Sequence, residues 1–141
     1  MNHASQLQTQ KTALQFFEAY NQGDIQEMLS LFTNESIVSF IPMGESGKGK
    51  VKEFGQTIWG MLLKSFPNIK NELIKSKTED SGNLICELKF TGKQPADFAD
   101  IKNKEKEFNT DHIFVFKFDD NGLISEMSVT WDHEDFCRQL S

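Results

Sequence analysis

The sequence predicts an α+β fold in which three helices from the N-terminal half pack into a curved antiparallel sheet. Apolar residues recur at helical spacing near the start of the chain. The last third instead holds runs of β-branched and aromatic residues separated by turn formers, as in β-hairpins. The predicted order is helix, helix, strand, helix and then four strands, which is typical of an α+β domain.

The N-terminal half contains three predicted helices and one strand. The first helix covers about 5–21 and ends at Gly23, after which Asp24 and Glu27 form a capping box for a short second helix. A strand over 35–41 follows and stops at Pro42. The third helix covers about 49–65. The inward-facing residues of the three helices are Leu7, Ala13, Leu14, Phe16, Phe17, Tyr20, Ile25, Met28, Leu29, Phe32, Val51, Phe54, Ile58, Met61 and Leu62.

The C-terminal half contains two predicted hairpins. The first pairs 69–78 with 83–91 around an Asp-Ser-Gly turn, and the second pairs 108–118 with 123–132 around Asp-Asp-Asn-Gly. The polar stretch 92–106 between them is interpreted as a loop or rim of the sheet. A last turn of helix over 134–140 closes the chain.

The turn of the second hairpin decides which side chains share a face. A type I turn with a glycine bulge pairs Asp119 with Leu123, and counting outward places His112 opposite Thr130 and on one face with Asp132. A two-residue Asn-Gly turn would shift the register by one and separate His112 from Asp132. We favour the bulged turn. The opposite face then carries an apolar patch that a second copy of the chain would cover, made of Ile113, Val115, Met127, Val129 and Trp131.

Composition limits the classes of function. The 141 residues, 38% of them hydrophobic, form a single domain over 1–141. A formal charge of −6 without any basic run argues against nucleic acid and anionic membranes as partners. The N-terminus does not resemble a signal peptide, and Cys86 and Cys137 fit thiols in a reducing compartment, so we expect a cytoplasmic protein. Thirteen phenylalanines indicate a large apolar interior, either a packed core or a lined cavity.

One glycine-rich stretch has the spacing of a phosphate-binding loop. Residues 44–51 read Gly-Glu-Ser-Gly-Lys-Gly-Lys-Val, but Val51 stands where a Ser or Thr must ligate magnesium. We interpret the stretch as a flap at the mouth of a pocket. His3, His133 and Glu134 have no metal-ligand spacing, so we expect neither a metal nor a cofactor.

Three stretches together resemble the SnoaL-like branch of the nuclear-transport-factor-2-like superfamily. They are Phe17 to Asp24 followed by Met28 to Phe32, then Phe90-Thr91-Gly92 with the loop after it, and Gly122 through Asp132 to Leu140. The resemblance implies a cone-shaped, cystatin-like fold with a deep apolar pocket, usually dimeric through the sheet. Characterised members close rings in polyketide esters by intramolecular aldol condensation, without metal or cofactor. Their acid–base aspartate falls on Asp132, whereas Ser128 and Gln94 replace a tryptophan and a histidine that are usual in the family.

These residues define a candidate site. A carboxylate inside an aromatic pocket has a raised pKa, so Asp132 is the predicted base, and His112 could donate to an enolate oxygen. The alternative is that Asp132 caps the last helix and His112 is an ordinary core histidine. The predicted substrate-binding residues are Tyr20, Phe40, Trp59, Phe90, Gln94, Phe114, Phe116 and Ser128.

Three functions remain open on this basis. The first is a cofactor-free acid–base enzyme, an aldol cyclase or isomerase, that acts on a small apolar carbonyl compound. The second is a binding or carrier protein of the same fold that performs no chemistry. Ketosteroid-isomerase chemistry comes third, because Tyr20 is the one obvious piece of the oxyanion hole that it needs.

Overall fold

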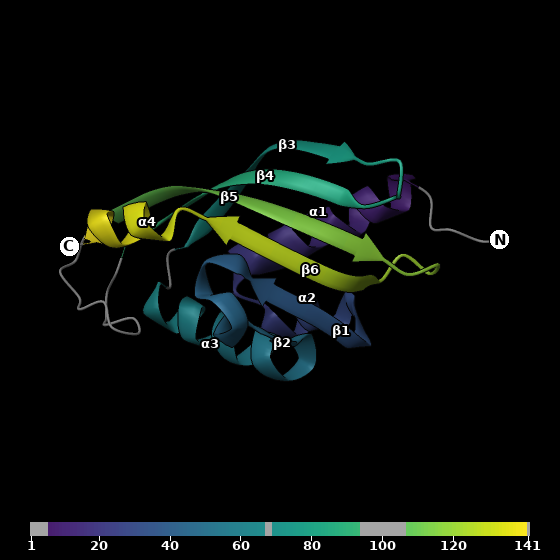
Figure 1. Cartoon of the computed structure of the whole chain (residues 1–141), viewed down its shortest axis with the longest axis horizontal. Helices are drawn as coiled ribbons and strands as arrows, with labels where there is room; N and C mark the ends of the chain where they lie inside the picture. The colour runs from purple at the N-terminus through teal and green to yellow at the C-terminus, as the bar shows by residue number, and fades with distance from the viewer. Residues whose placement is uncertain (1–5, 67–68, 94–106, 141) are drawn as a thin grey trace.

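A six-stranded sheet packs with one face on helices in the computed structural model of the chain, which describes residues 6–66, 69–93 and 107–140 (Figure 1). The strands are β1 (Phe32–Phe40), β2 (Lys48–Lys50), β3 (Lys70–Thr78), β4 (Leu84–Lys93), β5 (Glu107–Phe118) and β6 (Ile124–Trp131), in the spatial order β2-β1-β6-β5-β4-β3. The helices are α1 (Gln6–Gln22), α2 (Ile25–Ser30), α3 (Gln56–Ser65) and α4 (His133–Leu140). The α+β prediction is confirmed.

The sheet is mixed rather than purely antiparallel. β1 runs parallel to β6, with Val38 opposite Met127 and Phe40 opposite Val129, while all the other neighbouring strands are antiparallel. Hairpin turns join β3 to β4 and β5 to β6 and make these pairs antiparallel, but no turn joins β1 to β6. The hairpin signals in the sequence therefore could not predict that β1 and β6 run parallel.

The helix boundaries follow the capping residues. Gly23 ends α1 with a φ of 70°, a conformation that costs glycine little. The Asp24 carboxylate accepts a hydrogen bond from the Glu27 N–H at 3.1 Å, which caps α2 as predicted. Phe32 was placed on the second helix, but α2 ends at Ser30 and Phe32 begins β1, so that part of the prediction was wrong.

The predicted third helix starts later than its sequence pattern suggested. Residues Ile41–Gly47 form 3₁₀ turns, Lys48–Lys50 pair with β1 as a short edge strand, and Val51–Gly55 form a π turn before α3. A side chain at Gly49 would come within 2.7 Å of the Phe54 Cβ, so glycine allows the strand to lie close to that ring. Because the Lys48–Lys50 stretch pairs with β1, it does not form a phosphate cradle.

A β-bulge changes the register of the second hairpin. The turn itself is as predicted, since the Asp119 N–H donates to the Leu123 oxygen at 2.8 Å and Phe118 lies opposite Ile124. Beyond that pair β6 contains one extra residue, so Phe116 lies opposite Met127, Phe114 opposite Val129 and His112 opposite Trp131. The predicted pairs of Phe116, Phe114 and His112 with Glu126, Ser128 and Thr130 were wrong by one residue.

The bulge has a clear physical reason. It turns the apolar residues Met127, Val129 and Trp131 toward the helices, and the polar residues Glu126, Ser128 and Thr130 away from them. Met127 and Val129 are almost completely buried in the single chain. The expected apolar patch on the outer face therefore does not exist in the form predicted.

The interior next to α1 is a packed cluster of aromatic rings. Phe16 is fully buried and contacts six other rings at centroid distances of 5.3 to 6.3 Å, namely Phe17, Tyr20, Phe32, Trp59, Phe114 and Phe116. Edge-to-face contacts of this kind stabilise a core beyond simple burial. Next to α1, the phenylalanines thus form a packed core and not a lined cavity.

Candidate functional site

A stack of three rings crosses the sheet from β4 over β5 to β6. Helix α4 directly follows β6 at this end of the sheet (Figure 1). His112 of β5 lies between Phe90 of β4, at a centroid distance of 4.5 Å, and Trp131 of β6, at 5.3 Å with the rings nearly parallel. His112 pairs with Trp131 on β6 and with the buried Leu88 on β4, so both rings face inward. Phe90 lies two residues after Leu88 and therefore faces the same side. We call Phe90, His112 and Trp131 the aromatic stack.

His112 is the titratable group of the aromatic stack. The ring is half-buried, and this burial lowers its pKa from about 6.5 to about 4, against a smaller opposing effect of a hydrogen bond with the Thr110 backbone. Its Nδ1 also lies 3.2 Å from the Thr110 hydroxyl, which is itself buried. The imidazole is therefore neutral at pH 7 and held in place, and it keeps some exposed surface that another molecule could reach.

Asp132 lies outside the aromatic interior. Its carboxylate is exposed and accepts the Asp135 N–H at 3.0 Å, which caps α4. Strand β6 ends at Trp131, so Asp132 does not face Thr110 and does not share the inner face with His112 as predicted. The bulge explains the difference, because the inward position next to His112 goes to Trp131.

Helix α4 is attached to the edge that β6 leaves open. The Gln139 side chain accepts the Asn109 N–H at 2.7 Å and donates to the Asn109 oxygen at 3.0 Å. The amide thus replaces the strand residue that would otherwise pair with Asn109. Gln139 also donates to Asp135 at 2.8 Å, which fixes the start and the end of α4 to each other. These contacts hold the helix beside the aromatic stack.

A chain of hydrogen bonds links the stack to α4. The Trp131 indole N–H donates to His133 Nδ1 at 3.2 Å, and His133 Nε2 lies 3.4 Å from the Cys137 sulfur. Since an indole nitrogen can only donate, His133 Nδ1 must accept and the neutral ring carries its proton on Nε2. Sequence reasoning did not connect these residues, although the four-residue spacing of His133 and Cys137 on a helix would have placed them on one face.

The other predicted binding residues divide into three groups. Tyr20, Phe40, Trp59, Phe90, Phe114 and Phe116 are all buried, as expected for the interior. Ser128 lies on the outer face opposite Val115, so the bulge removes it from the side that was predicted. Gln94 lies outside the described residues.

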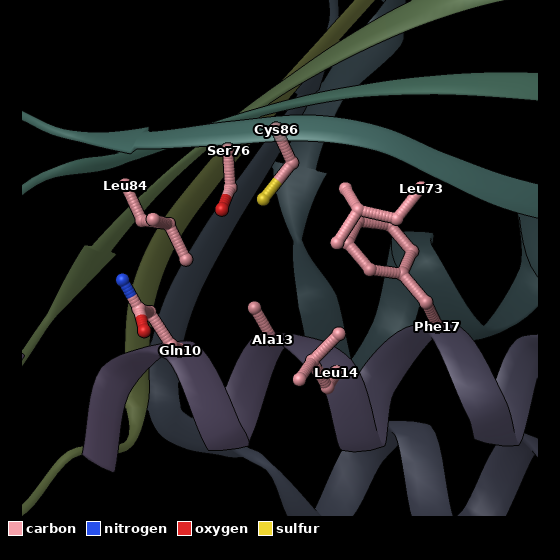
Figure 2. Close-up of a pocket in the computed structure, with 8 residues that line it drawn as sticks. All are labelled: Gln10, Ala13, Leu14, Phe17, Leu73, Ser76, Leu84 and Cys86. Atoms are coloured by element: carbon pink, nitrogen blue, oxygen red, sulfur yellow. The ribbon is translucent and has the colours of Figure 1, made fainter. Parts of the chain in front are cut away.

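Two pockets occur among the described residues away from the aromatic stack. One, of about 70 Å³, lies between α1 and strands β3 and β4 (Figure 2), and is lined by Gln10, Ala13, Leu14, Phe17, Leu73, Ser76, Leu84 and Cys86. The other, of about 300 Å³, lies at the hairpin turns and is lined by Thr9, Asp80, Ser81, Gly82, Asn83, Phe118 and Asp119. The first has room for a few water molecules only. The second is polar and holds no group that suggests chemistry.

The two thiols should differ in reactivity. Cys86 is buried, and burial raises its pKa to about 12, whereas Cys137 is half-buried beside His133. Because the thiolate is the reactive form, iodoacetamide at about pH 8 should alkylate Cys137 in the folded protein and Cys86 only after unfolding in urea. Peptide mass spectrometry measures this directly. Labelling of Cys86 in the folded protein would contradict the buried position on β4.

Other types of site find little support in the part of the chain that the structure describes. Within residues 6–66, 69–93 and 107–140, no three His, Cys, Asp or Glu side chains gather in a way that could hold a metal ion. None of the helices there is long and apolar enough to span a membrane.

Comparison with known proteins decides the family. Residues 13–127 match the model of the SnoaL-like domain. The chain belongs to the SnoaL-like family. This match confirms the resemblance to that branch of the nuclear-transport-factor-2-like superfamily. No curated protein matches the chain significantly in sequence.

Solved SnoaL-like and related structures share the fold at low identity. A candidate SnoaL-like polyketide cyclase from Jannaschia sp. CCS1 is 16% identical, with a TM-score of 0.84 over 96% of this chain and 92% of that one. AclR, a candidate hydroxylase from Streptomyces galilaeus, is 13% identical, with a TM-score of 0.82 over 96% and 97% of the two chains. SalBIII, an epoxide hydrolase/cyclase-like enzyme with a role in pyran ring formation, is 16% identical, with a TM-score of 0.73 over 90% and 92%. One fold therefore serves several reactions.

Proposed function

We propose that this SnoaL-like protein is a cofactor-free acid–base enzyme of the cyclase or isomerase type that acts on a small apolar carbonyl compound. The observation that carries the proposal is the neutral, partly accessible His112 between two aromatic rings. A neutral imidazole can donate a hydrogen bond to a carbonyl oxygen that gains charge as an enolate forms. Stacked rings on both sides would hold a flat apolar ligand beside it.

The reaction also needs a base, and Asp132 is the candidate that the family resemblance implies. Within the described ranges no aspartate or glutamate is buried, so a base from those residues must act from the rim of the aromatic interior. Asp132 directly follows the stacking residue Trp131 in the chain, which supports its choice as the base. In this proposal Asp132 removes a proton from a carbon next to the carbonyl, and His112 donates to the enolate oxygen.

A second candidate function has one observation in its favour. The Asp132 carboxylate is exposed and occupied as the cap of α4, which is the geometry of a structural residue. The same aromatic stack would then bind an apolar carbonyl compound without transforming it, as a carrier does. The two functions differ in whether the protein accelerates proton removal from a bound carbon acid.

Hydrogen–deuterium exchange tests the proposal. The protein is incubated in D₂O with a panel of β-keto esters and related 1,3-dicarbonyl compounds, and NMR follows both binding and loss of the acidic C–H signal. We expect at least one compound that binds to exchange faster than in buffer alone. Binding without any acceleration across the panel would favour the carrier.

We further propose that the protein forms a homodimer through the outer face of the sheet. Three apolar side chains lie together there. Ile85 pairs with Val115, and Ile113 lies two residues before Val115 on β5, on the same face, with 42% of its surface exposed. Light scattering at tens of micromolar should give the mass of a dimer, and Ile113→Arg should give a monomer that remains folded, since this side chain is already exposed. A monomeric wild type would contradict the proposal.

A further inference from the structure

Thr110 carries a buried hydroxyl beside the imidazole of the aromatic stack. Only 5% of the surface of Thr110 is exposed. Among the residues that the structure describes, the partner of this hydroxyl is His112 Nδ1, at 3.2 Å. A buried hydroxyl needs an acceptor for its proton, because an unpaired donor costs free energy. The Thr110 hydroxyl therefore donates, and Nδ1 accepts through its lone pair.

The backbone of Thr110 is a weaker competitor for the same ring. Its hydrogen bond with the imidazole is the smaller of the two effects on the pKa of His112. The N–H and the oxygen of Asn109 both bond to the Gln139 side chain, so they point away from β4. Successive residues of a strand direct these groups to alternate sides, so the Thr110 oxygen faces Phe90, its partner in β4. That oxygen belongs to the sheet, and the hydroxyl is left for the ring.

The imidazole is held against this hydroxyl by its neighbours. Phe90 lies on one side of the ring at a centroid distance of 4.5 Å, and Trp131 lies nearly parallel to it at 5.3 Å. With Nδ1 beside Thr110, the second nitrogen, Nε2, points away from Thr110. The ring is neutral at pH 7 and carries one proton. Because Nδ1 accepts, this proton is on Nε2.

We infer that Thr110 is a positioning residue, whose hydroxyl fixes the tautomer of His112 and makes Nε2–H the donor to the ligand oxygen. This inference rests on the proposed function and assigns its donor atom. A ring that is fixed in one tautomer can donate without rearranging as charge develops on the oxygen. With the proton on Nδ1 instead, the Nε2 lone pair would repel an enolate oxygen.

NMR of the ligand-free protein tests the tautomer directly. Two-bond ¹H–¹⁵N correlations at pH 7 distinguish protonated from unprotonated ring nitrogens, and a spectrum of His112→Gln assigns the signals. We expect the wild-type ring to carry its proton on Nε2. Thr110→Val removes the hydroxyl at nearly constant volume and should move part of the population to Nδ1–H, since the backbone oxygen remains as an acceptor. Thr110→Ser retains a hydroxyl and should restore the wild-type pattern.

His133 is an internal control in the same spectra. Its Nδ1 accepts the Trp131 indole N–H at 3.2 Å, so its proton should stay on Nε2 in every variant. A general loosening of this end of the sheet would disturb both histidines. A change that is confined to His112 is the signature of the lost hydroxyl.

Deuterium exchange connects the tautomer with the proposed reaction. At saturating β-keto ester, Thr110→Val should exchange the C–H about five- to tenfold more slowly than the wild type, the factor that corresponds to one hydrogen bond. Its affinity for the same compound should change less, because the donated bond strengthens as the oxygen gains charge. Thr110→Ser should recover most of the rate.

The outcomes separate this inference from the proposed function. A wild-type ring protonated on Nδ1, or the same His112 spectrum in Thr110→Val and the wild type, would overturn the role of Thr110. Faster exchange with that wild type than in buffer would still support the acid–base enzyme. If the wild type binds the β-keto ester without accelerating exchange, the proposed function and the donor role both fail, even where the spectra confirm the tautomer.

Discussion

The variant Val129→Arg should fail to fold, whereas Ser128→Arg should give a folded protein. Val129 has 2% of its surface exposed and faces the helices, opposite Phe114. An arginine there would bury an uncompensated charge, which costs about 3–5 kcal/mol. That is comparable with the whole free energy of unfolding of a small domain, about 5–15 kcal/mol. Circular dichroism and a urea titration measure the loss.

Ser128 is the matched control, because it lies next to Val129 in the chain but faces the other side of the sheet. Its replacement by arginine should change the free energy of unfolding by about 1 kcal/mol or less, as at other outward positions. The register counted from the hairpin turn alone predicts the reverse, with Val129 outward and Ser128 inward. A folded Val129→Arg protein with an unfolded Ser128→Arg protein would therefore contradict the bulge in β6, where Ser125 is the extra residue.

The variant Asp132→Asn should lose most of the exchange activity without losing the fold. Loss of a positioned base typically lowers a rate by about 10²–10⁴. The amide oxygen can still accept the Asp135 N–H, and asparagine caps helices about as well as aspartate. The melting temperature and the affinity for β-keto esters should therefore stay close to those of the wild type. If Asp132→Asn instead lowers the melting temperature and leaves the exchange rate unchanged, Asp132 acts only as the cap of α4.

The pH dependence should carry the signature of His112. Burial holds the pKa of this imidazole near 4, so the ring is neutral at pH 7 and stays neutral down to about pH 5. Its contribution to the exchange rate should therefore stay constant as the pH falls through about 6.5, the ordinary pKa of histidine. A decrease of the rate that is centred near 6.5 and disappears in His112→Gln would contradict a buried neutral ring.

Local signals in the sequence were sufficient for most of the elements. The capping box at Asp24, the glycine after α1 and the Asp-Asp-Asn-Gly turn each act over a few residues, and each occurs where it was predicted. The parallel pairing of β1 with β6 depends instead on residues that lie far apart in the chain. No short motif reports such a contact.

The error in the candidate site has a different cause, which is the register of the second hairpin. The alternation of apolar residues at 127, 129 and 131 is out of step with that at 114, 116 and 118 if the turn alone sets the register. Matching the two apolar faces requires one extra residue in β6, so the sequence did contain a signal for the bulge. Counting from the turn overlooked it, and placed Thr130 opposite His112, where Trp131 lies.

Deuterium exchange with binding followed in the same samples tests the central claim most directly. Wild type and Asp132→Asn are each incubated in D₂O with the panel of 1,3-dicarbonyl compounds, and NMR reports the bound fraction and the remaining C–H signal. The proposed function predicts equal binding and an exchange rate about 10²–10⁴ lower in the variant. Equal exchange rates for a compound that both proteins bind would contradict acid–base catalysis by Asp132.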